Sequence, residues 1–297
     1  MIFSRTRREV LGRLLYLGSS SLFLSWPGAS CRPATESDDD DEQIFRRKFS
    51  EAAALSLDGK PFGDLIVAVA LSFRGSPYVA HSLDVPGPEK LVVNLRGFDC
   101  LTLVESSLTI ARCVRLRRNS FDDYRNQLRE IRYRSGIIEA YPSRLHYFTD
   151  WVADNERKDI VTDVTSILGG VERERRIDFM SHHRGSYRQL ESDVYFDAIR
   201  ETESRLSSAT RYYIPQDSVE TAMEKVRTGD IVGLTSTVEG LDIAHTGFAY
   251  RIGGQVRLLH ASSSGRAVEV SEGSLVDYLT AQKKQDGLIV VRPVDPA

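Results

Sequence analysis

The chain has 297 residues, with 39 basic and 42 acidic side chains, and its formal net charge at pH 7 is −3. A chain of this length can bury a large core, and hydrophobic residues at 41% with charged residues at 27% are typical of a globular protein. The near-balanced charge, without a basic stripe, argues against nucleic acid as a partner.

Residues 1–31 have the pattern of an export signal. Arginines precede an apolar stretch, residues 10–26, and small residues follow it. The pair Arg7-Arg8 resembles a twin-arginine signal. An uncleaved membrane anchor is the less favoured reading, because serines interrupt a short apolar run. We therefore expect an exported protein that is periplasmic or held at the cell envelope.

The end of this signal resembles a lipobox. Cys31 would become the acylated first residue of a lipoprotein, but Gly28 stands where that pattern has an aliphatic residue. Plain cleavage of the signal is the alternative, so contact with the membrane is expected only through an acylated Cys31. Residues 32–43 carry a dense acidic run, which predicts a disordered, solvated linker. The remaining residues, 44–297, are expected to form a single domain.

The first part of this domain has helical periodicity. Its apolar residues recur at helical spacing within residues 44–80, 121–131 and 194–206, and a short helix is expected around residues 222–226. Residues 91–95 predict a short strand or an extended lead into the segment that follows.

That segment centres on Cys100. The residues after it are apolar on most helical faces, which predicts a buried helix, and Asp99 is a good N-cap for it. Cys100 would then be the first helical residue, where the helix dipole favours the thiolate and lowers the thiol pKa. A buried cysteine that only fills space is the alternative. On one helix, Cys100 and Cys113 would lie ~20 Å apart, too far for a disulfide.

Two other polar clusters attract attention. Residues 133–136 and 141–151 are predicted to be loops rich in aromatic, Arg and His side chains, which either line a polar cleft or simply pack. His182 and His183 are adjacent and lack spaced acidic partners, so a metal site there is disfavoured and no metal or other cofactor is expected.

The last third of the chain changes to strands. Alternating patterns and glycine turns predict strands at residues 231–234, 244–252, 255–261, 267–270 and 288–292, with a helix at 275–281. Helices followed by an antiparallel sheet indicate an α+β fold. His245 and His260 lie on strands joined by a hairpin, so their imidazoles can be neighbours. A cysteine with a histidine that takes its proton, and a polar group that orients the histidine, form a nucleophilic site.

These motifs resemble a known family. The segments around Cys100, around His245 and around His260 are similar to the Cys–His–His core of NlpC-type papain-like cysteine hydrolases. More narrowly, the chain from about residue 61 to its end resembles the N-acetylmuramoyl-L-alanine amidase-like family. The supporting segments are residues 76–78, 131–136, 143–147, 150–151, 229–231 and 241–242.

The resemblance implies a papain-like fold, with the nucleophile in a helical N-terminal part, and hydrolysis of an amide bond in peptidoglycan. It implies Cys100 as nucleophile, His245 as general base and then acid, and His260 as the residue that orients His245. The expected substrate-binding residues are Tyr78, Arg144, His146, Tyr147 and Asp242.

The resemblance leaves open which bond is cut. The expected substrate is a muropeptide or another peptidoglycan fragment, cut at the N-acetylmuramoyl–L-alanine bond by a protein expected to be a monomer. One alternative is an endopeptidase that cuts at a γ-D-Glu bond of the stem peptide. Others are a zinc amidase and a non-catalytic peptidoglycan-binding lipoprotein.

Overall fold

The computed structural model describes residues 34–55 and 59–297, and residues 38–297 form one compact unit. The export signal, Arg7-Arg8 and Cys31 lie outside the described residues. None of the helices in the described ranges combines the length and apolar character that a membrane span needs.

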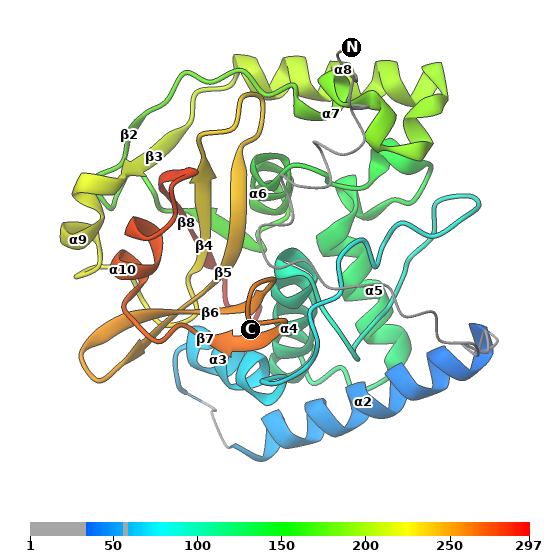
Figure 1. The fold of residues 1–297 in the computed structure, drawn as a ribbon. Helices are drawn as coiled ribbons and strands as arrows, with labels where there is room; N and C mark the ends of the chain where they lie inside the picture. The colour runs from blue at the N-terminus through cyan, green and yellow to red at the C-terminus, as the bar shows by residue number, and fades with distance from the viewer. Residues whose placement is uncertain (1–33, 56–58) are drawn as a thin grey trace, which may run out of the picture. The chain divides into compact units, whose positions relative to one another are not determined.

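The unit is α+β, as the sequence predicts, with helices in the first half and an antiparallel sheet built mainly from the second (Figure 1). The helices are α2 (Ala34–Ala54), α3 (Phe62–Ser72), α4 (Cys100–Arg115), α5 (Phe121–Arg132), α6 (Phe148–Arg157), α7 (Phe179–His182), α8 (Asp193–Ser208), α9 (Val219–Ala222) and α10 (Leu275–Thr280). Short 3₁₀ turns cover Arg134–Gly136, Tyr141–Ser143, Arg184–Ser186, Arg188–Glu191 and Gln216–Ser218.

The sheet runs in the order β2-β3-β8-β4-β5-β6-β7, and β1 also pairs with β8. Its strands are β1 (Val161–Asp163), β2 (Val171–Glu172), β3 (Tyr212–Pro215), β4 (Ile231–Ser236), β5 (Ile243–Ile252), β6 (Gln255–Ser262), β7 (Ala267–Val270) and β8 (Gln285–Pro293). Each ladder between these strands is antiparallel. The C-terminal strands match their predicted positions. The sequence analysis did not predict β1, β2 and β3, of which β1 and β2 have only three and two residues.

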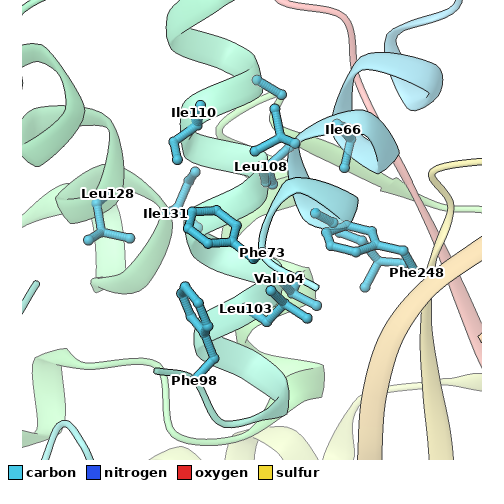
Figure 2. Packing of buried hydrophobic residues seen from close by; sticks show 14 of the residues in the cluster. Ile66, Phe73, Phe98, Leu103, Val104, Leu108, Ile110, Leu128, Ile131 and Phe248 are labelled. Carbon is cyan, nitrogen blue, oxygen red and sulfur yellow. The ribbon is translucent and has the colours of Figure 1, made fainter. Parts of the chain in front are cut away.

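The helix α4 lies at the centre of the core. It packs against α3 and α5 on its helical sides and against β5 and β6 of the sheet. Figure 2 shows Leu103, Val104 and Leu108 of α4 beside Ile66 of α3 and Phe248 of β5, all within one hydrophobic cluster. Nearly every α4 residue from 102 to 113 is buried, so the predicted buried helix is confirmed.

A buried ion pair fixes α4 to α5. Glu105 of α4 is 1% exposed and accepts a hydrogen bond at 2.7 Å from the guanidinium of Arg132, which is 3% exposed. Arg132 also donates to the carbonyl of Val92 in the segment that leads to Cys100. Two charges in so dry a place are tolerated because each is paired and hydrogen-bonded.

The structure corrects the prediction of a disordered acidic linker. The acidic run belongs to α2, and Asp41 within it is fully buried. Its carboxylate accepts the backbone N–H of Leu95 at 2.9 Å and pairs with Arg96 at 3.3 Å. The burial of the Asp41 carboxylate is favourable because these partners, more than 50 residues further along the chain, satisfy it. The predicted aromatic loop is likewise corrected at its end, because α6 begins at Phe148.

We expect Glu105→Leu to destabilise the fold by about 3–5 kcal/mol, because the change leaves the buried Arg132 without its counter-charge. The double variant Glu105→Leu/Arg132→Met removes both charges and should recover most of that loss. Urea unfolding of the two variants and the wild type measures the difference. A loss below about 1 kcal/mol in the single variant would contradict the role given to the pair.

Candidate active site

Cys100 is the first residue of α4, and Asp99 caps this helix as predicted. The Asp99 carboxylate accepts the backbone N–H of Thr102 at 2.8 Å, and the Thr102 hydroxyl accepts the N–H of Asp99 at 2.9 Å. This reciprocal capping box holds the turn that carries the sulfur. The backbone N–H groups of Leu101 and Thr246 are directed at the thiol. The sulfur thus lies where the helix start meets β5.

The protonation of this thiol differs from the sequence expectation. Burial raises the pKa of the Cys100 thiol to about 12, and the nearby Asp99 carboxylate adds to the increase. The N–H groups of Thr246 and Leu101 act in the opposite direction but are outweighed. The predicted lowering of the pKa by the helix end is therefore corrected: the resting side chain is a thiol at neutral pH.

The structure brings His245 and His260 together, as their positions on a hairpin predict. His245 Nε2 lies 2.6 Å from His260 Nδ1, and the two rings stand at 86° to each other. Gly247 permits this close approach, because a Cβ there would lie 2.7 Å from the Leu259 carbonyl and 2.9 Å from His260 Cβ. The two imidazoles form one hydrogen-bonded pair on neighbouring strands.

Both imidazoles are neutral at physiological pH. Burial lowers the pKa of His245 to about 3, with a further contribution from His260, and burial lowers the pKa of His260 to about 4. In a neutral pair, one ring donates across the 2.6 Å contact and the other accepts. Since His245 uses Nε2 in this contact, Nδ1 is the nitrogen that it can offer to a proton donor.

Cys100 and His245 line one cavity of about 190 Å³. Its walls are mainly apolar or aromatic, and no arginine or lysine is among its lining residues. The other lining residues are Leu101, His146, Tyr147, Phe148, Phe179, Met180, Tyr187, Leu241, Asp242, Ile243, Ala244 and Thr246. The arrangement can hold an uncharged group next to a thiol and an imidazole that can accept its proton.

Three of the predicted substrate-binding residues line this cavity. Burial lowers the pKa of His146 to about 3, and its neutral ring donates through Nε2 to the Tyr141 carbonyl at 2.9 Å. The Tyr147 hydroxyl donates to Glu203 at 2.7 Å and accepts the N–H of Met180 at 2.9 Å.

The third, Asp242, uses both of its carboxylate oxygens within the protein. One oxygen accepts from the backbone N–H and hydroxyl of Thr149, and the other accepts the N–H of Ile243. These bonds make Asp242 a brace between α6 and the start of β5.

Arg144 and Tyr78 lie outside the lining of this cavity. Arg144 is 6% exposed and donates to the Leu83 carbonyl and to Asp84, with Glu89 at 3.6 Å. The structure therefore places its guanidinium in an internal ion-pair cluster. The backbone of Tyr78 forms a β-bridge with Phe98, beside the turn that carries Cys100.

The sequence analysis missed Tyr278, which lies on α10. Its ring is 6.2 Å from the His245 ring and 5.1 Å from the His260 ring, measured between centroids. It covers the imidazole pair and helps to keep it dry. One aromatic residue in a short helix carries no signal of such a role, because only the packing of α10 on the sheet brings it there.

The adjacent histidines bond to the backbone at the start of their own helix, α7. The Nδ1 of His182 donates to the Asp178 carbonyl, and the Nδ1 of His183 donates to the Phe179 carbonyl. Within residues 34–55 and 59–297, the structure gathers no group of three or more metal-ligating side chains.

Comparisons with known proteins agree with this fold. A crystal structure of an N-acetylmuramoyl-L-alanine amidase from Bacteroides uniformis is 33% identical, with a TM-score of 0.73, and the match covers 78% of this chain and 99% of that one. A crystal structure of a putative xylanase from Bacteroides fragilis is 34% identical, with a TM-score of 0.69, and the match covers 75% of this chain and 98% of that one.

A more distant structure shares the fold alone. It is a protein from Legionella pneumophila with the family model DUF1460. It is 19% identical, with a TM-score of 0.66, and the match covers 88% of this chain and 97% of that one. No curated protein matches the sequence. The model of one family matches residues 68–288, which is most of the chain. The chain belongs to the N-acetylmuramoyl-L-alanine amidase-like family.

Proposed function

We propose that this protein is a cysteine-dependent amidase that hydrolyses the N-acetylmuramoyl–L-alanine bond of peptidoglycan fragments. The observation that carries the proposal is the cavity shared by Cys100 and His245, with His260 bonded to the far nitrogen of His245. A helix that bears the thiol and an antiparallel sheet that bears the imidazoles also support a papain-like arrangement of the NlpC type.

The protonation states define the first chemical step. Because thiol and imidazole are both neutral at rest, the proton leaves sulfur as the sulfur attacks the amide carbon. His245 Nδ1 takes this proton, and the backbone N–H of Cys100 stabilises the oxyanion. The imidazolium then protonates the leaving amine, and water hydrolyses the thioester with His245 again acting as base. His260 keeps the His245 ring oriented throughout.

The chemistry of the cavity favours one bond over the alternative. A γ-D-Glu endopeptidase must hold a free carboxylate close to its nucleophile, and arginine or lysine is the usual partner of such a group. Neither lines this cavity, and its one carboxylate, Asp242, is engaged within the protein. The N-acetylmuramoyl–L-alanine bond has an uncharged lactyl group on one side and an alanine methyl on the other, which suits apolar walls.

We place this reaction in the cell envelope. The family acts on peptidoglycan, and the export pattern of residues 1–31 directs the chain to the compartment that holds this polymer. Acylation of Cys31 would fix the protein to a membrane, whereas plain signal cleavage would release it. Peptidoglycan fragments are the proposed partner in both cases.

We expect the wild-type protein to convert a defined muropeptide into a free sugar and a stem peptide that begins with L-alanine, as read by mass spectrometry. Cys100→Ser should lower this turnover by at least about 10³-fold, because a hydroxyl is a far weaker nucleophile. Cys113→Ala, which removes the other cysteine of the described unit, is the matched control and should stay active. Near-normal turnover by Cys100→Ser would remove the sulfur from the mechanism, and a stem peptide cut after D-Glu would refute the assigned bond.

The two histidines should differ when substituted. His245→Ala should lose roughly 10²–10⁴-fold in kcat, because this ring exchanges the proton with sulfur and with the leaving amine. His260→Asn should retain a reduced activity, since its amide oxygen can accept the His245 N–H. Steady-state kinetics, with circular dichroism as the folding control, separates the roles. Equal inactivity of both folded variants would assign proton transfer to His260 as well.

Activity should fall on the acid side only below about pH 6.5, which is the pKa of a solvent-exposed imidazole. We call this fall the acid limb of the pH profile. The base must be neutral to act, and burial lowers the pKa of His245, so activity persists until the pH falls towards that lowered value. Tyr278→Ala should admit water to the two imidazole rings and so move the acid limb of the kcat/KM profile to higher pH. A wild-type limb at or above pH 6.5 would show that the buried pair is not the titrating base.

A further inference from the structure

One nitrogen of the histidine pair lacks a hydrogen-bond partner. His260 is 1% exposed, its Nδ1 meets His245 at 2.6 Å, and its Nε2 is buried without a hydrogen bond. A buried polar nitrogen in this state costs free energy, so such groups in native proteins usually have a partner or a function.

Within the described residues, three titratable side chains face His260. His245 approaches from β5, Tyr278 packs its ring against the imidazole from α10, and Glu269 approaches from β7. Glu269 is directly opposite His260 in the ladder of β6 and β7, and its Oε1 lies 3.9 Å from Nε2. Of these three side chains, Glu269 is the one with a carboxylate.

The mechanism dictates which nitrogen carries each proton. His245 must keep Nδ1 free to take the thiol proton, so its Nε2 bears hydrogen and donates to His260 Nδ1. A neutral His260 that accepts at Nδ1 must then bear its own hydrogen on Nε2. The unpartnered nitrogen is therefore an N–H donor, and it faces the Glu269 carboxylate.

The turn between β6 and β7 leaves room for that carboxylate. A Cβ at Gly265 would lie 2.4 and 2.5 Å from the two carboxylate oxygens of Glu269, so an alanine there would make the carboxylate move. Glu269 is 40% exposed on its side chain, which leaves the carboxylate free to rotate. A displacement of about 1 Å towards Nε2 would bring it into hydrogen-bond range.

We propose that Glu269 is a positioning residue that extends the pair to a Cys100–His245–His260–Glu269 series. The inference rests on the proposed function, because it concerns the charge that forms on His245 during attack. As His245 takes the thiol proton, its Nε2–H donates more strongly to His260, and the His260 Nε2–H is drawn to the carboxylate. In this response the His245 Nε2 and His260 Nε2 hydrogens stay on their nitrogens, and no covalent bond forms or breaks at His260 or Glu269.

The kinetic test compares Glu269→Gln with Glu272→Gln in the full protein. Glu272 is an exposed glutamate just past β7 and serves as the matched control. Glu269→Gln should lower kcat roughly tenfold with KM unchanged, since an amide accepts the N–H but lacks the charge. Gly265→Ala, which displaces the carboxylate without removing it, should reproduce this loss. Unchanged kcat in both Glu269→Gln and Gly265→Ala would overturn the proposal.

The second readout reports the tautomer directly, without substrate. Nitrogen-15 NMR of histidine-labelled protein at pH 7, assigned with His260→Asn, should show the His260 hydrogen on Nε2. In Glu269→Gln the Nε2 resonance should shift, because the facing charge is gone. A hydrogen on Nδ1 of His260 would refute the series even if the enzyme is active. Turnover by Cys100→Ser would instead refute the proposed function and leave this tautomer result readable.

Discussion

The burial of α4 is the constraint on which the other features of the site depend. This helix begins at Cys100 and has α3, α5 and the sheet packed around it, so it cannot slide or rotate without opening the core. The pairing of Glu105 with Arg132 adds a directional contact about one and a half turns along α4 from the sulfur. The thiol is thereby held against the start of β5, where the strand delivers His245.

The same burial determines the charge state of the site. A helix N-terminus stabilises a thiolate by about 0.3–1 kcal/mol at an exposed position. Removing a charged group from water can shift its pKa by up to about 3–5 units, which is a larger free energy. Burial therefore outweighs the dipole at Cys100, and it also keeps His245 and His260 neutral. A neutral thiol and a neutral imidazole therefore line the same cavity.

Polar residues near the cavity mostly build its walls. Asp242 braces Thr149, and the Tyr147 hydroxyl joins Glu203 to the backbone of α7. These satisfied groups hold the walls in place and leave the surface next to the sulfur largely apolar. His146 is the exception, because a neutral ring that donates through Nε2 offers Nδ1 as an acceptor.

Features that depend on residues close together in the chain could be predicted from the sequence. Periodicity identified the buried helix after Cys100, Asp99 was recognisable as its cap, and the hairpin placed His245 near His260, because caps, helical faces and hairpins are local. The sequence did not reveal the pairing of β1 and β3 with β8, the burial of Asp41 against Leu95, the internal use of Arg144, or the approach of Tyr278 to the imidazole pair. These features either join elements that are distant in the chain or depend on how the elements pack together. The thiol pKa is of this second kind, because desolvation depends on everything that surrounds the sulfur.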